Sequence, residues 1–354
     1  MAFELTYLAA LPELGFDAIL DVRSPAEFSE DHVPGAISLP VLSDEERARV
    51  GTIYVQESPF KARKLGAALV ARNAARHLEG ALAEKDGGWR PLVYCWRGGQ
   101  RSGSFASILQ QIGWRAETLA GGYQSYRRLV VRALYERAFP APVVVLDGNT
   151  GTAKTRLLAL LKARGLQVID LEAIAQHRGS ALGAYQGQPS QKGFETALAA
   201  EVAALDPEMP VVVEAESSRV GVLNLPPVLW KAMRAAPRVE ISAPVEARVA
   251  FLVEAYADMC ADPQALCARL QLLVPRQGRA RVDDWCALAQ AGAFAELARE
   301  LIIQHYDPGY AKLRALVEVP RQVVCTETLD AAGLGALADD IAARLMRGGG
   351  KLFE

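Results

Sequence analysis

A lone cysteine in a short stretch rich in glycine and arginine is the first feature of the sequence that could do chemistry. In VYCWRGGQRSG, Cys95 follows an apolar run, and Gly98 and Gly99 stand between Arg97 and Arg101. Such a loop can curl so that several backbone N–H groups face the sulfur, which favours a negative charge there. A thiol attacks only as its thiolate, so this loop predicts a reactive cysteine, and the two arginines suit an anionic substrate. The alternative is a buried core cysteine that ends a strand.

A second stretch, LDGNTGTAKT, is typical of a loop that binds phosphate, because it follows an apolar strand and opens a helix. Lys154 would supply a point charge for the terminal phosphate, and the hydroxyl of Thr155 could reach a Mg²⁺ ion if one is present. The usual pattern has glycine before the lysine, whereas Ala153 stands here and its methyl group crowds the loop. We predict eight successive phosphate-binding residues: Gly148, Asn149, Thr150, Gly151, Thr152, Ala153, Lys154 and Thr155.

Polar residues also follow two other predicted strands. His177 and Arg178 come shortly after LQVIDLE, and Glu216 and Arg219 come at the end of PVVVEAESS. The carboxyl ends of parallel strands gather at one edge of a sheet, where ligands bind. We therefore expect these four residues to meet Lys154 as substrate-binding residues, although a His-Arg pair is also common in a solvated turn.

The elements that must position these residues alternate between strand and helix. Short apolar runs at residues 16–23, 36–40 and 91–95 predict one set of strands, and runs at 142–148, 166–172, 210–218 and 236–244 predict a second set. From about residue 245 onward the pattern is mostly helical. This alternation predicts parallel sheets covered by helices. Two prolines near residue 140 mark a linker at 136–142, which divides the chain into domains at 1–135 and 143–354.

Composition narrows the class of protein. The 354 residues are 51% hydrophobic and 23% charged, which is an ordinary composition for a globular protein. The formal net charge of −2 neither indicates nor excludes binding to nucleic acid. The five cysteines form no CxxC pair, which argues against a disulfide framework and against a four-cysteine zinc site. There is neither a secretory signal nor an apolar run long enough to span a membrane. We expect a cytoplasmic protein with no bound metal.

The first half of the sequence resembles the rhodanese family. LDVRSPAEFSEDHVPGAISLP is similar to the family's opening signature, and the cysteine loop is its second, independent part. Rhodanese domains carry a chalcogen atom on the loop cysteine as a persulfide. The resemblance implies that Cys95 is the carrier and that Arg101 closes the loop, with Arg97 beside them as a further catalytic residue. Asp21, Arg23, Glu27 and His32 of the signature are expected to be structural.

Nearly the whole chain resembles the bacterial tRNA 2-selenouridine synthase family, because RGGQRS, the phosphate loop, DLE…HRGSA, ESSRVG and HYDPGY occur in this order. The resemblance implies an α/β fold: an N-terminal rhodanese-like domain and a C-terminal P-loop NTPase-like domain, each with a parallel sheet, and a helical C-terminal segment. It implies an enzyme that replaces the sulfur of wobble 2-thiouridine in tRNA with selenium. Geranyl diphosphate would S-geranylate the thio group, and selenophosphate would then supply selenium, with no tightly bound cofactor. The synthase that makes selenophosphate is a further expected partner, and no membrane is expected.

Three basic clusters could contact the anticodon loop of the tRNA, whose unstacked bases aromatic and arginine side chains can hold. They are FKARK at 60–64, SYRRLVVR at 125–132, and PRQGRARVDDW at 275–285 with Arg276, Arg279, Arg281 and Trp285. Each alone is also typical of a solvated face. The main alternative for the whole chain is a sulfurtransferase fused to a P-loop domain that uses ATP or GTP and does not act on RNA. A second alternative is a catalytically silent rhodanese-like domain that scaffolds a P-loop regulator, against which Cys95 argues.

Overall fold

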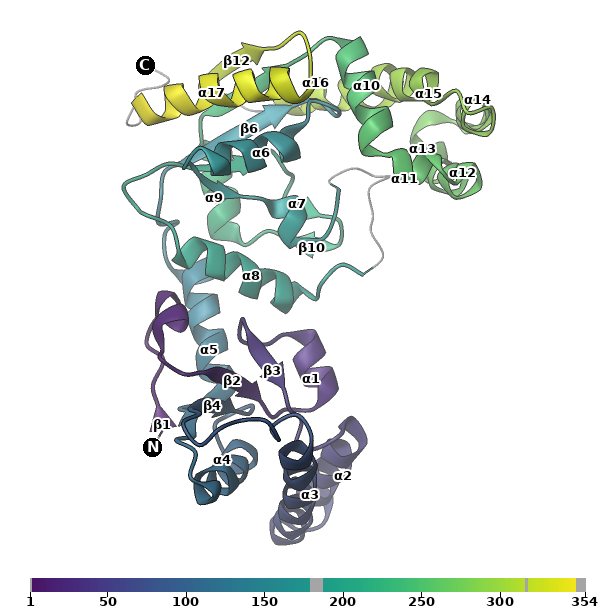
Figure 1. The fold of residues 1–354 in the computed structure, drawn as a ribbon. Coiled ribbons are helices and arrows are strands. Elements are labelled where there is room, and N and C mark those ends of the chain that lie inside the picture. Colours follow the sequence, from purple (N-terminus) through teal and green to yellow (C-terminus); the bar gives the residue numbers. More distant parts are fainter. Residues whose placement is uncertain (1, 179–186, 316–317, 348–354) are drawn as a thin grey trace. The chain divides into compact units, whose positions relative to one another are not determined.

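The computed structural model describes residues 2–178, 187–315 and 318–347, and these fall into two compact units (Figure 1). The first unit contains residues 1–137 and 189–204, and the second contains residues 138–188 and 205–354. The segment 189–204 departs from the predicted division at 136–142. It lies in the first unit because its helix carries buried Glu195 and Thr196, whose hydrogen-bond partners are Arg127, Tyr135 and Asp31.

The first unit is built on a five-stranded parallel sheet with the order β1-β5-β4-β2-β3. Its strands are short and apolar: β1 (Ala2–Phe3), β2 (Ala18–Asp21), β3 (Ala36–Ser38), β4 (Pro91–Tyr94) and β5 (Glu117–Leu119). All of β4 is buried, as expected for a central strand covered on both faces. The sheet confirms the parallel arrangement predicted from the apolar runs.

Helices cover this sheet and complete its core. They are η1 (Leu8–Glu13), α1 (Pro25–Glu30), α2 (Asp44–Gln56), α3 (Pro59–Glu79), α4 (Gln100–Ile112), α5 (Gly122–Val131), η2 (Arg132–Glu136) and α8 (Gln191–Ala203). Leu69 of α3 and Phe105 and Leu109 of α4 pack on Leu20 and Val93 of the sheet in one continuous core. Gly113 has φ +108° and caps the C-terminus of α4.

The second unit holds another five-stranded parallel sheet, ordered β12-β11-β6-β8-β7. Its strands are β6 (Val143–Gly148), β7 (Gln167–Ile169), β8 (Val211–Glu214), β11 (Arg238–Ser242) and β12 (Arg321–Cys325), and an antiparallel ribbon is formed by β9 (Arg219–Val220) and β10 (Leu223–Asn224). The strand β12 interrupts the C-terminal part, which the sequence pattern predicts as mostly helical. It pairs with β11 along five residues at the edge of the sheet.

Helices flank this sheet and then gather at one end of the unit (Figure 1). Those beside the sheet are α6 (Lys154–Ala163), α7 (Leu171–Ile174), α9 (Pro227–Ala235) and α17 (Ala331–Arg347). Those in the helical part are α10 (Val245–Ala255), α11 (Ala257–Cys260), α12 (Pro263–Leu270), η3 (Gln271–Leu273), α13 (Val274–Gln277), α14 (Arg279–Gln290), α15 (Phe294–Glu300), η4 (Leu301–Tyr306) and α16 (Asp307–Arg314). The helical part has its own apolar core around the buried Trp285.

Candidate functional site

The cysteine loop lies between β4 and α4 of the first unit, as the sequence predicts. Cys95 directly follows the last residue of β4 and is buried, with 3% of its surface exposed. Its Sγ lies 3.2 Å from Oγ of Ser102, a buried residue in the first turn of α4. The thiol therefore lies beside a hydroxyl partner at the start of α4, and its side chain also belongs to the apolar core of the first unit.

A neighbouring turn holds the backbone of this loop in place. The N–H of Tyr123 donates to the carbonyl oxygen of Cys95 at 2.8 Å, and that of Gln124 donates to the carbonyl of Trp96 at 3.0 Å. Two glycines allow this approach. Gly98 has φ +65°, and a Cβ on Gly122 would lie 2.2 Å from the carbonyl oxygen of Cys95. A side chain at either position would open the loop.

The two arginines of the loop have different surroundings. Arg97 is exposed, whereas Nη1 of Arg101 donates to Oε2 of Glu27 at 2.8 Å. Burial alone would raise the pKa of Glu27, but the hydrogen bond and charge of Arg101 outweigh it and hold that pKa below its ordinary value. Arg101 thus joins α4 to α1. Arg97 is the more exposed of the two.

The phosphate loop occupies residues 149–153, between β6 and α6 of the second unit. Gly148 has φ +155°, and a Cβ there would lie 2.6 Å from Oγ1 of Thr152. Gly151 has φ +85°, and its Cβ would meet Cγ of Leu252 at 3.0 Å. Ala153 takes the left-handed conformation, with φ +58°, at the position just before α6 where the usual pattern has glycine. The backbone at Ala153 is therefore in a conformation that is strained for residues other than glycine, while its buried methyl group packs with Leu329 and Leu334.

Lys154 lies at the start of α6 and folds back over the loop. Its Nζ donates to the carbonyl oxygen of Gly148 at 2.8 Å and lies 5.8 Å from the centre of the Tyr310 ring. Oγ1 of the exposed Thr155 donates to Oε2 of Glu172 at 3.2 Å. The lysine and the backbone N–H groups at the start of α6 together provide what an anionic phosphate group requires.

Three glutamates lie at or just after the ends of two strands, and two of them, Glu172 and Glu216, interact electrostatically with Lys154. The N–H of Glu172 donates to Oε1 of Glu214 at 2.6 Å, and Glu214 is fully buried. Burial, and then the charge of Glu172, raise the pKa of Glu214 well above its ordinary value. The same two causes raise the pKa of Glu216 to about 8, although Lys154 acts in the opposite direction. The site therefore retains protons on carboxyl groups at neutral pH, which reduces negative charge where a phosphate would bind.

Residues from the helical part support the phosphate loop, and they are not among the residues predicted for the site. Asp307 accepts a hydrogen bond from Nδ2 of Asn149 at 2.9 Å and pairs with Arg248. Nε of Arg248 donates to the carbonyl oxygen of Thr150 at 2.9 Å. Asp307 belongs to HYDPGY, so the motif was visible in the sequence. Its contact with Asn149 joins residues that are 158 positions apart, and the sequence alone does not show this contact.

The four residues expected beside Lys154 only partly meet it. Glu216 interacts with Lys154, whose charge opposes the rise in the pKa of the Glu216 carboxyl group. His177 is buried, which lowers its pKa, and its backbone N–H donates to the carbonyl of Glu172 at 3.0 Å. Arg178 binds both carboxylate oxygens of Asp258 at 3.0 Å. Arg219 is exposed and its Nε donates to Asn224 within the β9-β10 ribbon at 2.9 Å. Arg178 thus contacts Asp258, and Arg219 contacts Asn224, both of which lie outside the phosphate loop.

Within the described ranges, no group of three or more His, Cys, Asp or Glu side chains is arranged to hold a metal ion. The same part of the chain contains no helix that combines the length and apolar character needed to cross a membrane.

Comparison with known proteins identifies the family. The chain matches the tRNA 2-selenouridine synthase AAA domain over residues 141–272 and the Rhodanese-like domain over residues 4–129. Proteins named tRNA 2-selenouridine synthase are 35% identical in Bdellovibrio bacteriovorus, 33% in Nitrosomonas europaea and 33% in Cupriavidus pinatubonensis. These alignments cover 67%, 75% and 83% of this chain and 64%, 72% and 87% of the respective relatives. The chain belongs to the tRNA 2-selenouridine synthase family.

Membership of the tRNA 2-selenouridine synthase family confirms the predicted enzyme class and the predicted pair of α/β domains. Among solved structures, the N-terminal domain of a putative ATP/GTP binding protein from Clostridium difficile 630 has 32% sequence identity and a TM-score of 0.32. That match covers 37% of this chain and 99% of the other. The roles of the individual site residues remain predictions.

The basic clusters predicted to contact tRNA differ in exposure. Trp285 is 1% exposed and lies in the core of the helical part, so the prediction that it contacts a base is wrong. Arg276, Arg279 and Arg281 are exposed. In the first unit, Trp96 follows Cys95 and lines a surface pocket together with Arg128, Arg132 and Lys192.

Proposed function

We propose that this protein converts 2-thiouridine at the wobble position of tRNA into 2-selenouridine through an S-geranyl intermediate, using geranyl diphosphate and selenophosphate. The observation that carries the proposal is the pairing, in one member of this family, of a buried loop cysteine with a phosphate loop. Cys95 lies at the end of β4 in the first unit, and Lys154 lies at the start of α6 in the second. A transferase with two different anionic donors needs two anion sites of this kind.

The first step is assigned to the phosphate loop. The sulfur of 2-thiouridine forms a bond to C1 of the geranyl group, the C1–O bond breaks, and diphosphate leaves with the electron pair. The base loses its N3 proton, so the S-geranylated base is neutral. Lys154 and the N–H groups at the start of α6 would stabilise the charge that develops on diphosphate. Protonated Glu216 favours this step, because an ionised carboxylate there would repel the leaving group.

The second step is assigned to the cysteine loop. The selenium of selenophosphate forms a bond to C2 of the base, the C2–S bond breaks, and geranylthiol leaves after taking a proton. Water then cleaves the Se–P bond and releases phosphate, which leaves 2-selenouridine. The curled loop with exposed Arg97 and the thiol of Cys95 suits the binding of selenophosphate. S-alkylation makes this step possible, because a geranylthiolate is a better leaving group than sulfide.

Two further participants fit these sites. A Mg²⁺ ion that enters with the diphosphate would find oxygen ligands in the Thr155 hydroxyl and the Glu172 carboxyl, which are hydrogen-bonded to each other. The tRNA would contact the first unit at the pocket lined by Trp96, Arg128 and Arg132, where an aromatic ring and guanidinium groups lie beside the cysteine loop.

Two substitutions test this division of labour. Lys154→Ala removes the charge at the diphosphate site, so both geranylated and selenated nucleosides should disappear from the tRNA. Cys95→Ser retains the loop but removes the thiol assigned to the binding of selenophosphate, so selenation should stop and geranylated tRNA should accumulate. The measurement is mass spectrometry of wobble nucleosides from cells that carry each variant in place of the natural protein. Loss of geranylation in a folded Cys95→Ser protein would contradict the proposed division.

The competing function is a sulfurtransferase whose P-loop domain uses ATP or GTP without RNA. It would leave wobble 2-thiouridine unchanged when the protein is removed from cells, and the purified protein would turn over nucleotide in the absence of tRNA. Co-purifying RNA, seen as excess absorbance at 260 nm, would support the tRNA-modifying function instead.

A further inference from the structure

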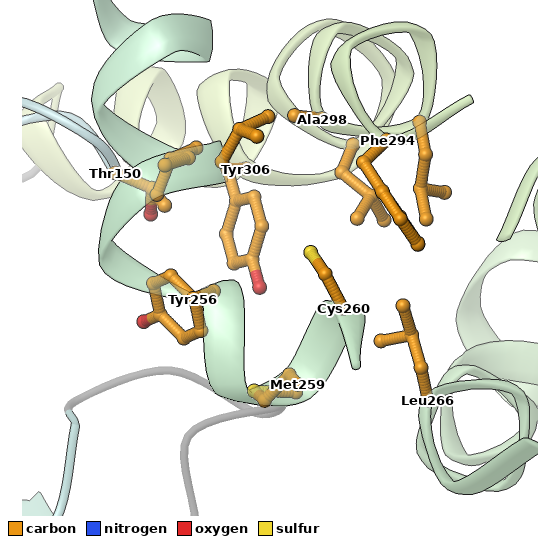
Figure 2. Close-up of a pocket in the computed structure, with 12 residues that line it drawn as sticks. Thr150, Tyr256, Met259, Cys260, Leu266, Phe294, Ala298 and Tyr306 are labelled. Atoms are coloured by element: carbon orange, nitrogen blue, oxygen red, sulfur yellow. The ribbon is translucent and has the colours of Figure 1, made fainter. Parts of the chain in front are cut away.

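An apolar pocket lies in the helical part of the second unit (Figure 2). Residues of α10, α11, α12, α15 and η4 line it, and the side chains of Cys260, Phe294 and Tyr306 point into it. Its volume is about 80 Å³, which holds a few carbon atoms, so a longer chain would fill it and extend past its mouth. Concave apolar sites of this kind are the usual binding sites for small hydrophobic groups.

This pocket adjoins the phosphate loop. Thr150, the third residue of the predicted phosphate-binding run, is one of the residues that line it. Leu252 also lines the pocket and packs against Gly151, where a Cβ would lie 3.0 Å from Cγ of Leu252. Arg248, one turn earlier on α10, fixes the carbonyl oxygen of Thr150 at 2.9 Å. An anion held by the loop would therefore lie beside an apolar cavity.

The chemistry of the lining favours a hydrocarbon over a nucleotide base. Among the described residues that line the pocket, none has a charged side chain, and most are aliphatic or aromatic. The polar groups it offers are the hydroxyls of Thr150, Tyr256 and Tyr306 and the thiol of Cys260. A purine base would leave several ring nitrogens and an exocyclic group against aliphatic side chains, which costs free energy for each unpaired polar group. A prenyl chain has no such groups.

We propose that this pocket binds the hydrocarbon chain of the prenyl donor while the phosphate loop binds its diphosphate. The inference rests on the proposed function and adds the place of the chain. Each buried methylene group is worth about fourfold in affinity, so the chain should tighten binding by at least about tenfold relative to inorganic diphosphate. The pocket would also hold the chain in a fixed direction from the diphosphate, which exposes C1 to the incoming sulfur.

Calorimetry with inorganic diphosphate and with geranyl diphosphate tests the inference. Ala298→Phe places a ring in the pocket, and it should remove the advantage of geranyl diphosphate while affinity for inorganic diphosphate stays within about twofold. Ala295→Phe makes the same change at an exposed position of the same helix and should alter neither affinity. Equal affinity of the natural protein for the two ligands, or a retained advantage in Ala298→Phe, would overturn the pocket assignment.

Alkylation of cysteines locates the chain without any substitution. Saturating geranyl diphosphate should slow the reaction of Cys260 with N-ethylmaleimide at least about fivefold, because the chain would cover a thiol that lines the pocket. Inorganic diphosphate should not slow it, and exposed Cys325 should react equally in all samples. Unchanged labelling of Cys260 would contradict the inference. A different result would show that the proposed function itself is wrong: Lys154→Ala would then bind inorganic diphosphate and geranyl diphosphate as tightly as the natural protein.

Discussion

Arg248 and Asp307, in the helical part of the second unit, form a bidentate ion pair that supports the phosphate loop. Nη2 and Nη1 of Arg248 lie 2.7 and 2.9 Å from Oδ1 and Oδ2 of Asp307. Arg248 is only 4% exposed, and its Nε fixes the carbonyl of Thr150. The loop geometry thus depends on a charge pair whose members lie far from the loop in sequence.

Replacement of Asp307 by alanine should therefore damage both stability and anion binding. It leaves the Arg248 charge buried without its carboxylate, which costs about 3 kcal/mol. It also removes the hydrogen bond from Asn149. We expect weaker binding of inorganic diphosphate by at least about tenfold and faster hydrogen exchange of the backbone in residues 143–163. Unchanged exchange and affinity in the variant would show that the ion pair does not support the loop.

Diphosphate binding should depend on pH through Glu216. Its pKa of about 8 in the folded protein lies above the unfolded value of about 4.3, so the folded protein holds an extra proton between these values. The associated stability is fully present below the unfolded pKa and is lost as pH rises through about 8. Ionisation also places a negative charge near Lys154. Affinity for diphosphate should therefore fall between pH 7 and pH 9.

Glu216→Gln provides the control for this pH dependence. Diphosphate itself titrates in the same pH range. The test therefore compares the pH profile of diphosphate affinity of the variant with that of the natural protein. In the variant, the affinity for diphosphate should fall less between pH 7 and pH 9, because no carboxyl group ionises at this position. Its thermal stability should also change less between pH 5 and pH 8 than that of the natural protein. Identical profiles for affinity and stability in the two proteins would count against a protonated Glu216.

Ala153→Gly should be tolerated or stabilising. Ala153 has φ +58°, a conformation that costs an L-residue about 1–2 kcal/mol, whereas glycine adopts it freely. The greater entropy of glycine in the unfolded chain offsets about 0.5–1 kcal/mol of this gain. The expected net stabilisation is about 0 to 1.5 kcal/mol, with unchanged diphosphate affinity by calorimetry. The matched control Ala159→Gly, in the middle of α6, should instead destabilise by about 0.5–1 kcal/mol.

Much of the fold and both loops could be predicted from the sequence, because their signals are local. Buried parallel strands appear as short apolar runs, and β4 and β6 are of this kind. Cys95 and Lys154 each stand just after such a run, so their places at strand ends follow directly. Edge strand β12 was not predicted, because its apolar run is only Val323 to Cys325 and four of its five residues are at least partly exposed.

Contacts between residues that lie far apart in the chain could not be predicted from the sequence. Nothing near Asp307 shows that it pairs with Arg248, and nothing in α8 shows that Glu195 bonds Arg127 and Tyr135 of the first unit. Trp285 illustrates the same limit. Flanking arginines indicated a surface aromatic, but its position on the inner face of α14 buries it. Burial of an amphipathic helix depends on its neighbours, which composition does not identify.

The last prediction concerns the loop of Cys95. Gly122 has φ +57°, and a Cβ there would lie 2.2 Å from the carbonyl oxygen of Cys95 and 2.4 Å from the nitrogen of Gly98. Because both obstacles are backbone atoms, Gly122→Ala must displace the loop. Selenation of tRNA should fall at least about tenfold while geranylation continues, since the phosphate loop is untouched. Gly103→Ala is the matched control, because a Cβ at this position of α4 meets no atom within 4 Å. It should retain selenation, and the two variants should be compared by mass spectrometry of wobble nucleosides. Normal selenation by a folded Gly122→Ala protein would mean that the curled form of this loop is not needed for selenium transfer.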